Sequence, residues 1–443
     1  MIGMAGMSAV QLLALGEGLT ISFGVDKLSV LFICITTLIW ILVGIYAVVY
    51  MKHEGRVGQF YLIYALLYVV LIALDCSANL VTMYACYELM TLVSMLLVCH
   101  NRSRESIMAT LKYLFYSMCG AYLGLFGIFY LNHYCVDLDF GSAGRLDMAA
   151  LAGHESTLLI VVFLMLIGFG TKAGMFPMHG WLPTAHPVAP APASAVLSGV
   201  ITKAGVLAII RVIYFLVGAG TLRGTWVQTA FLTLTLITVF MGSMLAYREP
   251  LLKKRLAYST VSQVSYVLFG LACLNPVAFS GAILHVVAHS TIKNCLFLCA
   301  GAIIHQTGKT YVRDLRGIGK QMPITIWCWT IASLGLIGIP PTGGFVSKWQ
   351  LATGAMGAGI GAFGVIGPVV LIISALLTAA YLLQLTINGF FPGSDYDYAA
   401  LENKEPGKLM TVPMIVLAVG VVLCGVLAQP LTNVIASAAA AIL

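Results

Sequence analysis

Several ionisable residues lie inside long apolar stretches of this chain. Glu88 lies near the centre of the stretch MYACYELMTLVSM, and Asp75 closes the apolar stretch that precedes it. Four lysines lie within other apolar stretches: Lys172, Lys203, Lys293 and Lys348. A charged side chain at the middle of a membrane helix costs about 2.5–3.5 kcal/mol on the insertion scale, so a chain that keeps several is expected to use them.

Two histidines and a lysine share one spacing. His285, His289 and Lys293 recur at every fourth position, which places them on one stripe of a helix. Burial disfavours the charged form of a lysine, and a nearby carboxylate favours it. A buried lysine near a carboxylate can therefore change its protonation state. A buried carboxylate, buried lysines and a histidine stripe are the components of a proton relay. The primary pathway candidates are Glu88, Lys172, Lys203, His289, Lys293 and Lys348.

Other residues carry weaker signals. Glu88 and Lys172 could instead form a static buried ion pair that only fixes helix packing. Arg211 is interpreted as an anchor at the membrane interface. Histidines beside a proline-rich turn could cap freed carbonyl groups as well as carry protons. The secondary pathway candidates are Asp75, His179, His186 and His285.

The composition indicates which elements position these residues. The 443 residues are 60% hydrophobic and only 9% charged, with a mean hydropathy of +0.99, whereas soluble domains are about 25% charged. The sequence predicts an all-α, multi-pass membrane protein with about twelve spans. These lie near 27–51, 58–75, 78–98, 108–131, 157–183, 192–217, 226–246, 257–273, 277–304, 323–358, 362–388 and 411–440.

The loops indicate an orientation. Alternate loops are rich in lysine and arginine, which places them in the cytoplasm of a prokaryotic cell and both termini outside. In this interpretation Lys253, Lys254 and Arg255 only determine topology. Residues 1–25 are too short and too rich in glycine for a further span, and they lack the pattern of a removable signal peptide.

Two spans are predicted to be interrupted. Pro177 follows Lys172, and the sequence GIPPTGG precedes Lys348. Proline lacks a backbone donor, and a broken helix at membrane depth needs a polar or hydrated interior. Paired broken helices are typical of transporters built from inverted repeats. We therefore expect a single membrane domain with repeats at 58–217 and 226–388 and a C-terminal helix at 411–440.

The sequence also disfavours some classes of site. Its eleven cysteines are scattered without a CxxC pair, so we expect neither a metal site nor a cofactor bound by this chain. The basic residues lie in short loops, so nucleic-acid binding is excluded as an explanation of the net charge of +7.

Five segments together resemble a known family. They are YELM at Glu88, the stretch from Thr171 to Arg211, LLKKRLAYSTVSQVSY, AHSTIKNCLFLCAGAIIH and GIPPTGGFVSKW. In one collinear order over about residues 25–390, they resemble the antiporter-like subunits of the complex I superfamily. This superfamily includes respiratory complex I, Mrp-type antiporters and energy-converting membrane-bound hydrogenases, and GFVSKW is most similar to the last two.

The resemblance implies residue roles. Glu88 corresponds to the family's essential glutamate, Lys172 to its partner lysine and Lys203 to the connecting lysine on the next helix. His289 and Lys293 correspond to the central polar axis, and Lys348 to the terminal site on the second broken helix. The family fold further implies two inverted five-helix repeats.

The resemblance also implies partners. Members usually have fourteen core helices, and by the position of Glu88 the first two are missing here, so either a neighbouring small or antiporter-like subunit supplies them or the complex does without them. We expect a subunit that translocates H⁺, or Na⁺, in a complex driven by a peripheral iron–sulfur module. The alternative is a stand-alone secondary transporter of a cation or organic solute, which broken helices alone would permit.

Overall fold

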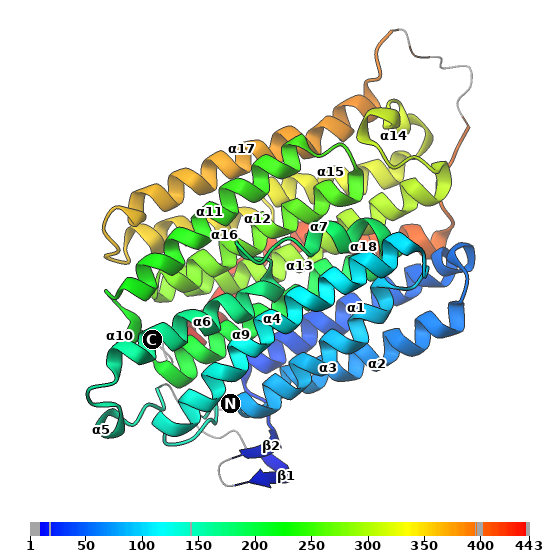
Figure 1. Cartoon of the computed structure of the whole chain (residues 1–443). Helices are drawn as coiled ribbons and strands as arrows, with labels where there is room; N and C mark the ends of the chain where they lie inside the picture. The colour runs from blue at the N-terminus through cyan, green and yellow to red at the C-terminus, as the bar shows by residue number, and fades with distance from the viewer. Residues whose placement is uncertain (1–8, 17–18, 142–143, 395, 397–401, 440–443) are drawn as a thin grey trace.

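The structure is a computed structural model, and it describes residues 9–16, 19–141, 144–394, 396 and 402–439. It is a bundle of long helices that run roughly side by side, with a small β-hairpin at one end (Figure 1). The predicted all-α membrane fold is confirmed. Within the described residues, ten segments are long and apolar enough to cross a membrane, and one shorter apolar helix accompanies them.

The first half of the chain contains the hairpin and the helices up to the first interrupted span. The strands are β1 (Val10–Gly16) and β2 (Leu19–Phe23). The helices are α1 (Lys27–Glu54), α2 (Val57–Asp75), α3 (Leu80–Val98), α4 (Arg104–Tyr134), α5 (Met148–Leu151), α6 (Glu155–Ala173) and α7 (Leu182–Val188). The next span comprises α8 (Ala191–Val196), the π-helix η1 (Leu197–Ile201), α9 (Thr202–Ile210) and the π-helix η2 (Arg211–Val217).

The second half continues the bundle. Its helices are α10 (Ala219–Leu222), α11 (Trp226–Arg248), α12 (Leu252–Ala272), α13 (Pro276–Thr307), the 3₁₀-helix η3 (Val312–Leu315), α14 (Ile318–Gln321), α15 (Pro323–Ile337), α16 (Gly343–Met356), α17 (Phe363–Phe390), α18 (Lys408–Val426) and α19 (Ala428–Ala439). The predicted final span 411–440 is therefore two helices separated at Leu427.

The bundle has two chemically different ends. At the hairpin end, β1 and β2 pair antiparallel, and the Asn79 side chain donates to the Thr20 carbonyl at 2.9 Å and to Ser22 Oγ at 2.8 Å. The opposite end, which we call the basic end, gathers the loops near 52–56, 100–104, 248–255 and 308–322. There Arg56 donates to the His100 carbonyl, and the rings of His53 and His305 lie 5.1 Å apart.

Both predicted interruptions are present, but a glycine ends each helix before the prolines are reached. Gly174 (φ 79°, ψ 28°) caps the C-terminal end of α6, and Gly338 (φ 91°, ψ 49°) caps the C-terminal end of α15. Glycine adopts these left-handed conformations without steric strain, which makes it the usual residue just past a helix end. The expectation that Pro177 itself breaks the helix is therefore wrong by three residues.

Two spans form the interior of the bundle. Every residue from Ala191 to Val217 is buried, and α13 is buried along nearly its whole length. Helix α13 packs against α1, α8, α12, α15, α16 and α18. A helix that is apolar all round is expected at the centre of a large protein. The polar residues on these two spans are thus shielded from lipid on every side.

Candidate functional site

Lys172 lies at the end of α6 in a fully buried cluster of hydroxyl groups. Its Nζ atom donates to Thr91 Oγ1 at 2.8 Å, to Tyr113 OH at 2.8 Å and to Ser117 Oγ at 3.1 Å. Nζ also lies 4.4 Å from the centroid of the Tyr113 ring. A buried ammonium is tolerated when all of its donors are used, and three donors match three acceptors here.

Glu88 is a neighbour of this cluster but not a direct partner of Lys172. It lies one turn before Thr91 on α3, and its side chain is half-buried. Its Oε1 atom is buried without a hydrogen-bond partner among the described residues. The ion pairs within the described part of the chain do not include Glu88 with Lys172. The static ion pair considered from the sequence is therefore absent from this structure.

A glycine allows the helices of Lys172 and Lys203 to approach closely. A Cβ atom on Gly205 of α9 would lie 2.6 Å from the Phe169 carbonyl oxygen and 3.0 Å from the Cβ of Lys172. Real Cβ atoms do not tolerate the first of these distances, so only glycine fits without a shift of backbone. Gly205 therefore places the two lysine-bearing helices in direct contact.

Lys203 follows a π-helical turn. In η1 the Thr202 amide bonds to the carbonyl of Leu197, five residues back. The Ser198 carbonyl instead accepts from Thr202 Oγ1 at 2.8 Å and from Lys203 Nζ at 2.6 Å. Single π-turns occur often at functional sites. Here the turn provides a carbonyl oxygen for the ammonium group.

A series of neighbouring polar side chains runs from Lys203 across α13. Lys203 Nζ lies 2.8 Å from His289 Nδ1, and the rings of His289 and His285 have centroids 6.0 Å apart. His285 Nδ1 lies 2.9 Å from Ser347 Oγ on α16. His285, His289 and Lys203 are all buried. The structure thus brings three predicted residues together in one row, which we call the central row.

Lys348 lies at the far end of the central row, one residue after Ser347. Its Nζ donates to the carbonyls of Leu336 at 2.5 Å and Ile337 at 2.9 Å, the last carbonyls of α15. The C-terminal end of a helix carries partial negative charge, so a cation is favoured there. The second break thus creates the acceptors that hold this lysine.

Lys293 is buried on the same helix as the two histidines but belongs to a side branch. Its Nζ donates to the Leu256 carbonyl at 2.9 Å and to Ser259 Oγ at 2.7 Å on α12. Tyr381 of α17 donates to the same Ser259 oxygen at 2.8 Å. The branch therefore leads from α13 through α12 to α17.

The remaining histidine candidates are not joined to the central row by any described hydrogen bond. His186 is buried and stacks on Phe297 at 4.8 Å, and neither of its ring nitrogens has a partner among the described residues. His179 is half-buried and stacks on Phe176 at 6.0 Å. Capping by His186 is thus not observed.

Arg211 is buried, which contradicts its interpretation as an interfacial anchor. It is 1% exposed and forms an ion pair with Asp26 at 2.5 Å at the hairpin end. Burial alone raises the pKa of Asp26, but the Arg211 guanidinium and hydrogen bonds from Ser29 outweigh it and hold the pKa below its usual value. The pair ties the start of α1 to the first residue of η2.

Two basic residues assigned only to topology also have structural partners. Lys253 donates to the carbonyl of Pro187 in the last turn of α7 and to the carbonyl of Ala189, the residue that follows this helix. Arg255 is buried and donates to the Tyr381 carbonyl at 2.9 Å and to Gln384 Oε1 at 3.0 Å. The sequence interpretation of these two residues was therefore incomplete.

Sequence reasoning missed most of the neutral groups around the lysines. Thr91, Tyr113 and Ser117 hold Lys172, Ser259 holds Lys293, and Ser347 contacts His285. Hydroxyl residues are frequent in membrane helices, so none of them carries a signal by itself. One helical signal was available, because Tyr113 and Ser117 are four residues apart and share a face of α4.

Comparison with known proteins identifies the family. The family described as "NADH:quinone oxidoreductase/Mrp antiporter, TM" matches residues 77–378. The family described as "NADH-Ubiquinone oxidoreductase (complex I), chain 5 N-terminus" matches residues 15–61. These two ranges contain every primary pathway candidate. The predicted resemblance is confirmed.

Individual relatives and a solved structure are similar to this chain over most of its length. NADH-quinone oxidoreductase subunit N of Desulforudis audaxviator is 34% identical over 421 residues, which are 88% of this chain and 80% of that protein. Hydrogenase-4 component B of Escherichia coli is 31% identical, over 89% of this chain and 60% of that protein. A chain of the Mrp complex of a Dietzia species has the same fold, with a TM-score of 0.85, 22% identity and coverage of 99% of this chain and 88% of that chain. The chain therefore belongs to the family of antiporter-like membrane subunits that NADH:quinone oxidoreductases, Mrp antiporters and energy-converting hydrogenases have in common.

Proposed function

We propose that this chain translocates H⁺, or Na⁺, across the membrane as a non-redox subunit of a redox-driven complex. The central row supports this proposal most strongly, because Lys203, His289 and His285 form a buried series that ends beside Lys348. All of these groups can gain and release a proton. Together with Glu88 and the Lys172 cluster, they provide proton-exchanging groups on both halves of the chain.

The partners follow from the same proposal. The relatives named above include subunits of multi-subunit membrane complexes, so membrane subunits are the first partners. We further propose that a peripheral iron–sulfur module supplies the driving reaction and that this chain binds no cofactor itself. The basic end would face the cytoplasm of a prokaryotic inner membrane, as the positive-inside rule requires.

Purification tests the complex. The chain would be tagged and isolated in mild detergent from its native membrane, and we expect small membrane subunits and an iron–sulfur protein to copurify. The isolated complex would then be placed in vesicles, and proton movement would be recorded after the electron donor is added. A chain that purifies alone and transports a cation or solute without a redox reaction would establish the stand-alone transporter instead.

The transported ion is identified in the same vesicles. Proton movement that persists without Na⁺ in the medium would identify H⁺. Movement of Na⁺ that persists when a protonophore collapses the pH gradient would identify Na⁺. A complex that oxidises its donor without moving either ion would refute the proposed function.

A further inference from the structure

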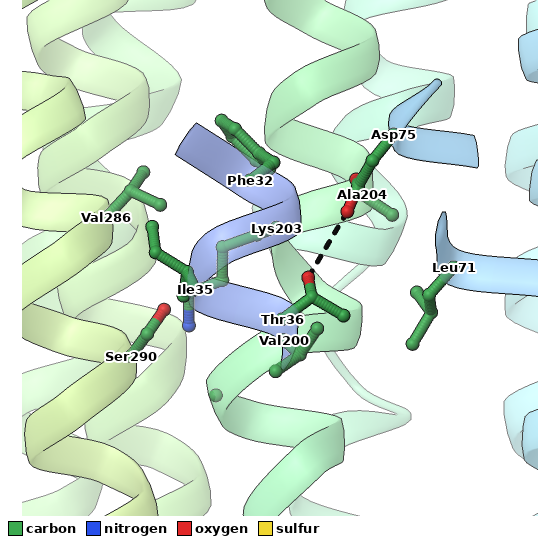
Figure 2. Close-up of a pocket in the computed structure, with 11 residues that line it drawn as sticks. Phe32, Ile35, Thr36, Leu71, Asp75, Val200, Lys203, Ala204, Val286 and Ser290 are labelled. Atoms are coloured by element: carbon green, nitrogen blue, oxygen red, sulfur yellow. Dashed lines mark hydrogen bonds between the residues drawn. The ribbon is translucent and has the colours of Figure 1, made fainter. Parts of the chain in front are cut away.

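A small cavity lies beside Lys203. It has a volume of about 10 Å³ and is lined by residues of α1, α2, η1, α9 and α13. Figure 2 shows Asp75 and Thr36 together at one side of the cavity and Ser290 at the other, with Lys203 between them. This volume is about what one water molecule needs.

Asp75 is a buried carboxylate with very few partners. It is 4% exposed, and Thr36 Oγ1 donates to its Oδ2 atom at 3.2 Å. This is the one hydrogen bond to its carboxylate among the described residues. A buried carboxylate anion needs several strong partners, so Asp75 must hold a proton, bind water or interact with a nearby cation.

The cavity contains a second unsatisfied polar group. Ser290 Oγ is fully buried and has no hydrogen-bond partner among the described residues. A buried hydroxyl without a partner is uncommon, and an ordered water is its usual solution. A water in the cavity would have Asp75, Ser290 and Lys203 as neighbours, which are the two to four polar partners that a buried water requires.

The side chain of Lys203 can contact both His289 and the cavity. In Figure 2 its nitrogen lies on the side of Ser290, and it is bonded to His289 Nδ1 at 2.8 Å. A lysine ammonium is a compact charge on a flexible four-carbon stem, so it can reorient without movement of the helix. The cavity lies directly along that stem.

We propose that Asp75 is a further proton-carrying residue of this chain and that it exchanges protons with Lys203 through the cavity, with Thr36 positioning its carboxylate. In the transfer an N–H bond of the Lys203 ammonium breaks and an O–H bond forms on Asp75, through one water, so both groups become neutral. Asp75 ends α2 at the hairpin end, so this branch runs from the centre of the bundle toward that end. The proposal deepens and rests on the proposed ion translocation.

The test uses the intact complex in vesicles and measures protons moved per electron transferred, alongside complex assembly. Asp75→Asn keeps the shape of the side chain but removes the proton-carrying group. The control is Asp147→Asn, which changes an exposed carboxylate at the same end, outside the cavity lining. A positioned proton carrier typically contributes about 10²–10⁴-fold. We expect at least about a tenfold loss of proton translocation for Asp75→Asn and none for Asp147→Asn.

Each outcome decides the proposal. Protons per electron equal to the control in an assembled Asp75→Asn complex would overturn it, because a merely structural residue changes assembly and not this ratio. If Asp75→Asn does not assemble, Thr36→Val decides, since it keeps the carboxylate but removes its hydrogen bond. A lowered ratio in Thr36→Val supports the proposal and an unchanged ratio overturns it. A wild-type complex that moves no ion refutes the proposed function itself, and the proposed exchange between Asp75 and Lys203 is then refuted as well.

Discussion

The ammonium nitrogen of Lys203 lies 2.8 Å from Nδ1 of His289, across two helices that are both buried in the bundle. A hydrogen bond between these nitrogens requires one of them to lack a proton, because two facing N–H groups repel. The pair therefore titrates as a unit, and a proton gained by one residue changes the affinity of the other. This relationship supports the expectation that distant parts of the site are coupled.

Replacement of Glu88 by glutamine should abolish translocation while the complex still assembles. The half-buried carboxylate has an unpartnered oxygen beside the Lys172 cluster, so an isosteric amide changes its proton chemistry more than its packing. We expect a loss of at least about a hundredfold in translocation rate per assembled complex. Glu105→Gln, at an exposed glutamate of the basic end, is the control and should behave as the wild type. Wild-type rates in Glu88→Gln would exclude Glu88 from the path.

Two substitutions of Lys172 separate charge from proton release. Lys172→Met removes both and should stop translocation. Lys172→Arg keeps a positive charge, but arginine does not release its proton. We therefore expect Lys172→Arg to retain at most part of the wild-type translocation rate. Rates would be normalised to the amount of assembled complex. Full activity of Lys172→Arg would show that a fixed charge among Thr91, Tyr113 and Ser117 is sufficient.

A double-mutant cycle tests the continuity of the central row. Lys203→Ala and Lys348→Ala would be made singly and together, and translocation rates would be compared on a free-energy scale. Because the His289 and His285 rings lie between the two lysines, we expect an interaction of about 1–3 kcal/mol. Additive effects would indicate two independent half-paths instead of one row.

Gly205→Ala should disturb the contact of α9 with α6. The new Cβ would lie 2.6 Å from a backbone carbonyl, which cannot move as a side-chain end can. Overpacking of this kind costs about 1–3 kcal/mol. We expect a lower midpoint of thermal unfolding in detergent and slower translocation. Gly220→Ala is the control, because a Cβ at Gly220 meets nothing within 4 Å. Equal midpoints for the two variants would contradict the close packing.

The ion pair of Asp26 with Arg211 predicts a pH dependence of stability. Its native pKa is below the usual 3.8 because Arg211 and Ser29 outweigh the effect of burial. A carboxyl with a depressed native pKa stabilises the protein above its unfolded pKa, and this contribution disappears as the pH falls through the native pKa. Loss of one partner of a buried pair costs about 3 kcal/mol.

The measurement is the thermal unfolding midpoint of the purified complex as a function of pH. Asp26→Asn should be less stable than the wild type at pH values above 3.8, and the two should converge as the pH falls below that value. Asp147→Asn, at an exposed residue of the same end, should follow the wild type throughout. A constant difference between Asp26→Asn and the wild type at all pH values would contradict the pH dependence.

The helical membrane fold and the buried charged residues could be predicted from the sequence, because both give strong local signals. Apolar stretches long enough to cross a bilayer predicted the helices, and the lysines in them are expensive enough to be noticed. The two interruptions were also visible as glycine and proline. The exact ends of the two helices could not be predicted as well. They depend on the left-handed backbone conformation of Gly174 and Gly338, which the neighbouring residues do not indicate.

The partners of the charged residues could not be predicted in the same way. Thr91 and Ser117 reach Lys172 from helices that lie more than 50 residues away in the chain. Such contacts depend on how helices pack, and hydroxyl residues on apolar helices have no spacing that specifies a partner. Arg211 was misjudged for the same reason, because its partner Asp26 lies 185 positions earlier.

The π-turn before Lys203 leaves a backbone carbonyl outside the amide ladder of the span. It takes one additional residue into a helix in which each residue adds about 100° of rotation, and the wider turn absorbs that rotation, so the segments on either side keep their faces. Because the Thr202 amide bonds to the Leu197 carbonyl, the Ser198 carbonyl is available to Lys203. Deletion of one residue between Leu197 and Ile201 would restore an ordinary α-helical turn with Lys203 still facing His289, but it would return that carbonyl to a backbone amide. The number of residues in this turn thus decides whether the lysine has a backbone acceptor.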